Sequence, residues 1–498
     1  MLEWFLSQQK KRQYFLHFSA LIAGLLLPFS FAPYDIVWLV IPLIAWLFLI
    51  SIEQSPANAF KRGWFFGLGW FGHGLYWLYY SLHVHGNAPI ALVIVILFFL
   101  ACYMALFPAF ALWCNRKFFK VSASMQLAII LPLSWYISEW LRGYFLTGFP
   151  WLEIGYTQID TILNGYVPII GNIGLSWVLV LISGLLVLLF LEKRRMIYGL
   201  VIGSLLTVGF ILQNIQWTQK IDKPIVVSLI QGNIAQKDKW KRSLRKSTID
   251  MYTRLSLQQK NSDVIIWPET AVPGFLSRVK TYLTPFQEKI KNRNQDLLYG
   301  LFVEDQATRQ YYNSVVDING KAYHKRHLVP LGEYFPFQSL MGFLRQWMDI
   351  PMSDIATGDD NQKPLMVAGQ PVGVSICFED AFDRNVLSTV PEATILINVS
   401  NDAWFEDSTQ PLQHHQIARM RALETGRYLL RVTNTGLTSI IKPDGKVLSR
   451  APQFERYVLT DTVYAMEGST PYVVWQNYLL MSGATLVLFG FYWRGRRA

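Results

Sequence analysis

Long apolar runs divide the chain into two regions with different patterns. Runs long enough to cross a bilayer fall at residues 14–32, 36–51, 63–82, 88–114, 124–141, 166–191, 196–213 and 473–493. Between the last two, short β-branched runs alternate with amphipathic stretches. We therefore predict a transmembrane domain of seven helices at 1–217, a water-exposed domain at 218–470, and an eighth helix with a tail at 471–498.

The pattern within 218–470 predicts a layered domain. Strands are expected at 225–230, 264–267, 297–302, 372–376, 394–399 and 429–433. Helices are expected at 241–259 and 411–425, the second ended by Gly426, and residues 443–446 form a turn between two further strands. Alternation of this kind indicates an α/β or α+β domain of about 250 residues.

Composition agrees with a membrane protein, and charge indicates its orientation. Hydrophobic residues make up 52% of the 498 residues and charged residues only 16%. The net charge of +11 could suit nucleic acid, but the basic clusters flank apolar runs at every second connection. They are Lys10-Lys11-Arg12, Lys61-Arg62, Arg116-Lys117 with Lys120, Lys193-Arg194-Arg195, and Arg494 with Arg496-Arg497. This positive-inside pattern predicts both termini in the cytoplasm, an uncleaved N-terminal signal-anchor, and the 218–470 domain outside the cytoplasm, with no nucleic-acid partner.

The three cysteines are too few for a disulfide framework. Cys102 and Cys114 lie about 18 Å apart along one predicted helix and cannot pair with each other. Cys377 is the only cysteine of the water-exposed domain. An unpaired thiol in an oxidising compartment indicates a chemical role, although a buried core cysteine is the ordinary alternative.

Three polar residues follow predicted strand ends or lie beside rigid turns: Glu269, Lys325 and Cys377. Singly, they are compatible with a capping carboxylate, a surface lysine and a core cysteine. Together they supply a nucleophile in Cys377, a general base in Glu269, and a cation in Lys325 that stabilises the oxyanion of an acyl-transfer reaction. Glu333 and Glu379 are expected to orient Lys325 or the substrate.

The histidines give no sign of a metal site or of a Cys–His pair. His83 and His85 have a weak spacing for metal binding, and His414 and His415 are expected to be packing or surface residues. No glycine-rich phosphate loop follows a predicted strand. We expect neither a metal nor a cofactor.

The ordered motifs carry a family resemblance. Glu269 lies in the segment WPET, Lys325 precedes LVPLGE, and Cys377 lies in SICFED. In this order the three residues resemble the Glu–Lys–Cys triad of the nitrilase superfamily. That resemblance implies an αββα sandwich. Further segments extend it over nearly the whole chain to the bacterial apolipoprotein N-acyltransferases: EWLRG, GFPWLEIGYTQID, QGNIAQKDKW, SNDAWF and QIARMRALETGR. The resemblance adds Trp240 and Phe378 to the site, Phe378 occupying a position where many members have Tyr.

The resemblance implies a reaction and its partners. The sn-1 acyl chain of a phospholipid, typically phosphatidylethanolamine, passes through a Cys377 thioester to the N-terminal amine of a diacylglyceryl-cysteine lipoprotein. It places the chain in the bacterial inner membrane with a periplasmic catalytic domain. The alternatives are a membrane-tethered amidohydrolase with the same triad, and a transporter or lipid-binding protein carrying an inactive enzyme fold.

Three membrane-related segments have two interpretations each. Residues 63–80 combine glycines and aromatic residues for close helix packing or for a lipid groove. Glu139 and Arg142 form either a helix-end ion pair or, with Trp151, part of a substrate site. Residues 334–350 form either a core-facing amphipathic helix or an arm that dips into the outer leaflet and gates lipid entry.

Overall fold

The computed structural model describes residues 2–336, 339, 342–347 and 354–497. It divides into two compact units. One comprises residues 1–78, 91–215 and 474–498, and the other comprises 79–90 and 216–473. The second unit is called the catalytic unit below, and the first the membrane unit.

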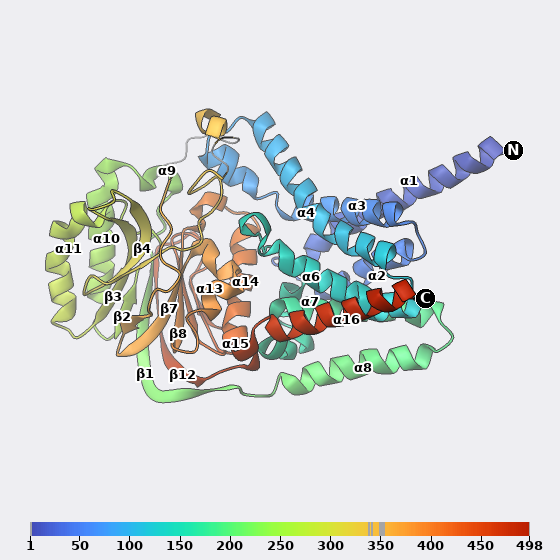
Figure 1. Ribbon diagram of the computed structural model, residues 1–498. Coiled ribbons are helices and arrows are strands. Elements are labelled where there is room, and N and C mark those ends of the chain that lie inside the picture. The colour runs from blue at the N-terminus through green and yellow to red at the C-terminus, as the bar shows by residue number, and fades with distance from the viewer. Residues whose placement is uncertain (1, 337–338, 340–341, 348–353, 498) are drawn as a thin grey trace. The chain divides into compact units, whose positions relative to one another are not determined.

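Two six-stranded sheets form the catalytic unit (Figure 1). The first has the order β12-β1-β2-β3-β4-β5, with β1 (Thr218–Gln231), β2 (Val264–Ile266), β3 (Asp296–Glu304), β4 (Tyr311–Asp317), β5 (Ala322–His324) and β12 (Tyr457–Gly468). The second has the order β11-β10-β9-β8-β7-β6, with β6 (Leu365–Val367), β7 (Gln370–Ile376), β8 (Ile395–Ser400), β9 (Leu429–Thr433), β10 (Ser439–Ile441) and β11 (Val447–Arg450). In both sheets parallel central strands are flanked by antiparallel ones.

Alternating side chains bury both faces of each sheet. Val264 and Ile266 of β2 face the core between the sheets, whereas Ile265 packs under helices α10 (Arg245–Gln258) and α11 (Leu276–Lys291). In the second sheet Ile395 and Ile397 face the same core, and Leu396 packs with residues of α13 (Asp383–Leu387) and α14 (Gln410–Thr425). The period of two produces a helix–sheet–sheet–helix sandwich, visible in Figure 1. The predicted αββα fold is confirmed.

The predicted elements of this unit are largely confirmed. Helix α14 ends where expected, because Gly426 adopts the left-handed conformation (φ 64°) that caps it. The turn at 443–446 joins β10 to β11. Strand β1 is longer than predicted, since its polar first half pairs with β12 across a bulge at residues 220–224.

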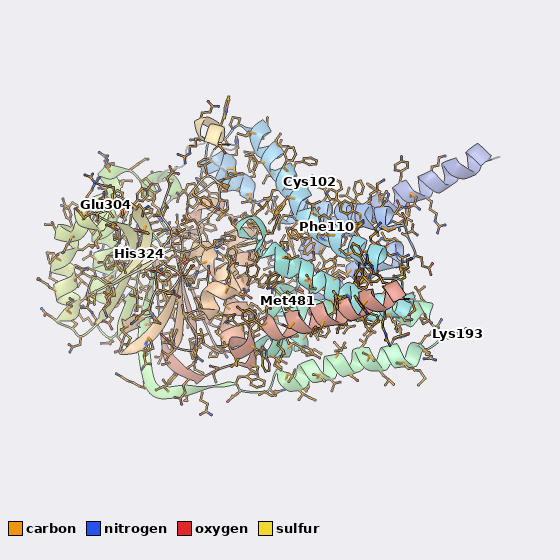
Figure 2. The ribbon with its side chains drawn as sticks, in the orientation of Figure 1. Cys102, Phe110, Lys193, Glu304, His324 and Met481 are labelled. Carbon is orange, nitrogen blue, oxygen red and sulfur yellow. The ribbon has the colours of Figure 1, made fainter. Side chains whose placement is uncertain are left out.

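Apolar helices build the membrane unit. They are α1 (Leu2–Leu26), α2 (Val40–Ser51), α3 (Pro56–Gly74), α4 (Ile90–Phe118), α6 (Leu131–Arg142), α7 (Val167–Leu191), α8 (Arg195–Leu212) and α16 (Tyr478–Arg497). Among the described residues, four helical segments are long and apolar enough to cross a bilayer. They are Lys11–Ser30, Ile90–Phe118, Ile162–Leu191 and Arg195–Leu212. The full count of eight spans stays a prediction. Lys193 of one basic cluster lies in the short turn between α7 and α8 (Figure 2).

The predicted span at 63–82 ends early. Helix α3 stops at Gly74, and residues 79–90 pack with the catalytic unit instead, around a π-helical turn at Tyr80–His85. There the His85 Nε2 atom lies 2.9 Å from Glu406 Oε1, and its ring packs edge-on against Trp404. Hydropathy alone could not separate this aromatic turn from the helix before it.

Glu139 and Arg142 form a buried ion pair within the membrane unit. The Arg142 Nη2 atom lies 3.2 Å from Glu139 Oε1, and the guanidinium also donates to the carbonyls of Phe149 and Trp151. Glu139 accepts a hydrogen bond from the Ile154 amide. The pair therefore holds the 143–154 loop against the end of α6. A role in substrate binding for Arg142 and Trp151 stays a prediction.

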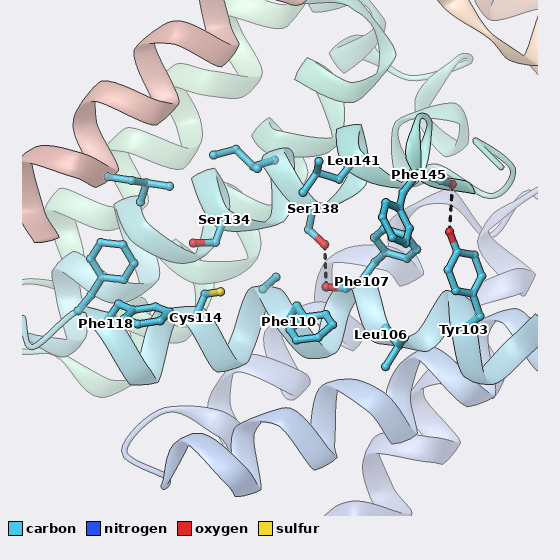
Figure 3. Close-up of a pocket in the computed structure, with 14 residues that line it drawn as sticks. Tyr103, Leu106, Phe107, Phe110, Cys114, Phe118, Ser134, Ser138, Leu141 and Phe145 are labelled. Carbon is cyan, nitrogen blue, oxygen red and sulfur yellow. Dashed lines mark hydrogen bonds between the residues drawn. The ribbon is translucent and has the colours of Figure 1, made fainter. Parts of the chain in front are cut away.

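An apolar cavity of about 500 Å³ lies among α4, α6 and α16 (Figure 3). Two of its polar lining groups are turned to the backbone: Ser138 donates to the Phe107 carbonyl and Tyr103 to the Phe145 carbonyl. The remaining walls are mostly aromatic and aliphatic, including Phe110 and Leu488. A surface of this kind suits lipid chains rather than water.

The predicted arm at 334–350 falls partly outside the described residues, which omit Phe337, Leu340, Met341 and Met348. Its described part includes a 3₁₀ turn at Gly342–Trp347, in which Trp347 is exposed. The gating hypothesis stays a prediction.

Candidate active site

Cys377 occupies a sharp turn between strand and helix. It follows the last residue of β7, opens the 3₁₀ helix η10 (Cys377–Ala381), and has a left-handed φ of 53°. Such a conformation costs about 1–3 kcal/mol in a non-glycine residue and persists only where neighbours hold it. The turn places a half-buried thiol at the carboxyl end of a parallel strand.

Lys325 and two carboxylates lie together at the ends of the other sheet. The Lys325 Nζ atom is 2.8 Å from Glu333 Oε1 and 3.8 Å from Glu269 Oε1. The Asn313 amide of β4 donates to Glu269 Oε1 at 2.7 Å, and its backbone carbonyl accepts from the Lys325 amide at 2.8 Å. Lys325 is 1% exposed, so the cation is held almost entirely by these partners.

Electrostatics couples these groups to the thiol. Burial lowers the pKa of Lys325, but the negative charges of Glu333 and Glu269 outweigh it and raise that pKa well above its usual value. Burial and the Glu269 charge raise the pKa of Cys377, while Lys325 acts to lower it. The thiol is therefore neutral at rest, and attack by this sulfur would need a base to take its proton.

Glu379 joins the two sheets behind the site. Its carboxylate accepts hydrogen bonds from the amides of Arg326 and His327, at 2.6 and 3.0 Å, and from the Ile376 amide at 2.7 Å. Tyr323 donates to the same carboxylate at 3.0 Å. Glu379 thus ties the backbone after Lys325 to the backbone before Cys377, whereas Glu333 alone of the two predicted orienting residues contacts the Lys325 ammonium.

A buried charged cluster lies behind the carbonyl of Cys377, and the sequence did not predict it. His414 bridges Asp380 and Asp402, with distances of 2.8 and 3.2 Å, and Arg431 Nη2 lies 2.9 Å from Asp402. The Cys377 carbonyl accepts from Asn398 Nδ2 at 3.1 Å and lies 3.3 Å from His414 Nε2. His414 therefore contacts the backbone of Cys377.

Trp240 and Phe378 contribute aromatic packing. Trp240 packs against Phe302, with ring centroids 5.8 Å apart. Phe378 lies in a cluster with His327 and Phe382, and the Phe378 and Phe382 rings meet edge to face at 5.0 Å. Burial lowers the pKa of His327 to about 3, so that ring is neutral. These contacts need ring shape at position 378 and use no hydroxyl.

The other predicted site residues lie in the membrane unit. Arg142 and Trp151 contact each other there, as described above. In the part of the chain that the structure describes, no three His, Cys, Asp or Glu side chains converge in a way that could hold a metal ion.

Comparison with known proteins identifies the family. Residues 23–185 match the family described as apolipoprotein N-acyltransferase N-terminal domain, and residues 226–472 match the carbon-nitrogen hydrolase family. An apolipoprotein N-acyltransferase of Methylococcus capsulatus is 41% identical over 465 residues, covering 92% of both chains. That of Vibrio vulnificus is 37% identical over 493 residues, covering 96% of this chain and 97% of the relative. The chain belongs to the apolipoprotein N-acyltransferase family.

Membership in the apolipoprotein N-acyltransferase family fixes the reaction class. The chain is an acyltransferase with a nitrilase-type catalytic domain, acting on a lipoprotein and a membrane phospholipid. Among solved structures, an amidase of the nitrilase superfamily from Nesterenkonia aligns with 52% of this chain and 96% of its own, at 15% identity and a TM-score of 0.37.

Proposed function

We propose that Cys377 carries the acyl group as a thioester, with Glu269 as general base and Lys325 as the oxyanion-stabilising cation. The observation that supports it most strongly is the contact of Lys325 with Glu269 and Glu333, beside a thiol on a strained turn. The reaction has two half-reactions that use the same groups in turn.

In the first half-reaction the Cys377 sulfur attacks the sn-1 ester carbonyl of a phospholipid. Glu269 accepts the thiol proton and passes it to the departing alkoxide, so lysophospholipid leaves and the thioester remains. The Lys325 ammonium stabilises the negative charge on the tetrahedral intermediate. Because its pKa is raised well above its usual value, Lys325 stays charged throughout.

In the second half-reaction the N-terminal amine of a diacylglyceryl-cysteine lipoprotein attacks the thioester. The amide forms, the C–S bond breaks, and Glu269 moves a proton from the amine nitrogen to the departing sulfur. A thioester is an activated acyl group and an amide is a stable product, so the transfer runs toward N-acylation.

We further propose phosphatidylethanolamine as the donor and the bacterial inner membrane as the location. Residues 218–470 would stand in the periplasm as the catalytic domain, and residues 1–217 and 471–498 would anchor it with both termini in the cytoplasm. The alternation of basic clusters along the chain supports this orientation, whereas the donor is proposed from the family resemblance.

The acceptor can be tested with the isolated acyl-enzyme. The full-length chain in detergent is incubated with phosphatidylethanolamine, freed of lipid, and given either a diacylated lipopeptide or buffer alone. We expect the lipopeptide to discharge the acyl group at least about a hundredfold faster than water. Equal rates with and without lipopeptide would favour a membrane-tethered hydrolase.

A further inference from the structure

Lys239 is a buried lysine beside the active site. It ends the short helix α9 (Gln236–Lys239) and is 4% exposed, whereas Lys237 on the same turn is exposed. Asn401 donates to the Gln236 side chain at 2.9 Å, which fixes this helix against the end of β8. Lysines are almost never fully buried unless they are paired.

Lys239 lacks such a pair within the described residues. Its Nζ atom donates to the backbone carbonyl of Glu269 at 3.2 Å, and no carboxylate there lies within ion-pair distance of it. Lys325, by contrast, has two carboxylates. A buried ammonium with one carbonyl partner is strongly destabilised relative to the neutral amine.

The charges that act on Lys239 belong to the reacting groups. Burial lowers the pKa of Lys239 to about 7, and the charges of Glu269 and Cys377 act in the opposite direction. A neutral fraction of Lys239 is therefore present at neutral pH, and its lone pair can accept a proton.

In the second half-reaction the acceptor nitrogen loses two protons, and Glu269 transfers only one of them. An N-terminal amine has a pKa of about 7.7–8.0 and enters mainly as the ammonium at pH 7. The ammonium must lose one proton before it can attack, and the nitrogen loses a second as the amide forms. Glu269 returns one of them to the sulfur, which leaves one proton without an acceptor.

We propose that neutral Lys239 is that acceptor: it takes the first proton from the incoming ammonium, becomes an ammonium itself, and later releases the proton to solvent. The free amine then attacks the thioester, its second proton passes through Glu269 to Cys377, and the sum is one amide, one thiol and one released proton. This inference rests on the proposed thioester at Cys377.

The test separates the two half-reactions in Lys239→Met, with Lys237→Met as the matched control. Methionine has a side chain of similar volume to that of lysine and lacks the amine that acts as the base. We expect thioester formation at Cys377 to match the parent protein. Discharge by a diacylated lipopeptide should be about tenfold slower at pH 7, and the gap should close by pH 9, where the acceptor amine is already neutral.

Two further measurements make the outcome decisive. Hydroxylamine, a small amine that is neutral at pH 7, should discharge both acyl-enzymes at the same rate. Lys239→Gln repeats the test should Lys239→Met fold poorly. The role of Lys239 would be overturned if the discharge rates of Lys239→Met and the parent protein differed by the same factor from pH 6 to 9. It would also be overturned if Lys239→Met discharged at the same rate as Lys237→Met. Absence of any thioester on Cys377 in the parent protein would instead overturn the proposed function.

Discussion

The backbone of Cys377 contacts a buried charged cluster formed by His414, Asp380, Asp402 and Arg431. Burial and Arg431 act to lower the pKa of His414, but the carboxylates of Asp380 and Asp402 outweigh them, so its pKa lies above the usual value. The protonated ring is the form that both carboxylates bind. It lies 3.3 Å from the Cys377 carbonyl, and so the cluster supports the left-handed turn from behind.

This cluster predicts a pH-dependent stability. A group whose pKa is raised by folding stabilises the protein fully below its unfolded pKa, about 6.5 for histidine, and loses that effect as pH rises through the folded pKa. We expect the apparent Tm to fall with rising pH above neutrality, and to fall less in His414→Gln. Thermal unfolding followed by tryptophan fluorescence from pH 5.5 to 9 measures this.

His415→Gln is the control for that experiment. His415 is buried next to His414, but burial lowers its pKa well below the usual value, so it stays neutral over this range. Above about pH 7.5, where the unfolded imidazole is also neutral, its replacement should leave the slope of Tm against pH unchanged. Identical slopes in His414→Gln and the parent protein would contradict the assigned charge.

The sequence marks the proposed reacting residues more clearly than the residues that support them. Glu269, Lys325, Glu333 and Cys377 are marked by their order and by neighbouring strand ends. His414 reaches the backbone carbonyl of Cys377 only because α14 packs against η10, a contact between residues 37 positions apart. The burial of Lys239 could not be predicted from the sequence either, because the two further lysines near it make the segment look like an exposed basic surface.

At the scale of elements, the site depends on how closely β3 approaches the loop after β2. A Cβ atom on Gly300 would lie 2.4 Å from the Pro268 carbonyl oxygen and 2.8 Å from the Glu269 Cα. Only glycine permits this approach, which sets the position of Glu269, the proposed general base.

We therefore expect Gly300→Ala to lower kcat by about ten- to a hundredfold while the protein remains folded, because small displacements of a catalytic group carry costs of that size. Gly274→Ala is the control, since its Cβ would meet only the Arg245 side chain at 3.4 Å. Steady-state transfer of a labelled acyl chain compares the two. Equal activity in both variants would show that the loop adjusts freely.

Periodicity explains which elements could be predicted. Central strands such as β8 and β9 are buried along their full length and read as short, mostly apolar runs, interrupted by Asn398 in β8 and Arg431 in β9. The irregular segments could not be predicted, because the π-helical turn at Tyr80–His85 and the 3₁₀ turn at Cys377 arise from contacts with distant residues. The early end of α3 has the same cause.

At the scale of the whole molecule, the predicted topology places Asp444 and Lys193 on opposite sides of the membrane, and cysteine labelling can test this. In a chain whose native cysteines are replaced by alanine, we expect Asp444→Cys to react with a membrane-impermeant maleimide in cells with a permeabilised outer membrane. Lys193→Cys should react only after the inner membrane is opened. Asp444 lies in the exposed β10–β11 turn and Lys193 in a basic cluster. Labelling of Lys193→Cys while the inner membrane is intact would show that the orientation is the opposite of the predicted one.

The central claim is that one acyl group resides on Cys377 between the two half-reactions. Its most direct measurement is peptide mass spectrometry of the full-length chain after a single turnover with phospholipid and no acceptor. The account predicts up to one acyl group per chain, on the peptide that contains Cys377, with an equal amount of lysophospholipid released and neither product formed by Cys377→Ala. Amide formation by Cys377→Ala, or an acyl group on any other residue, would contradict it.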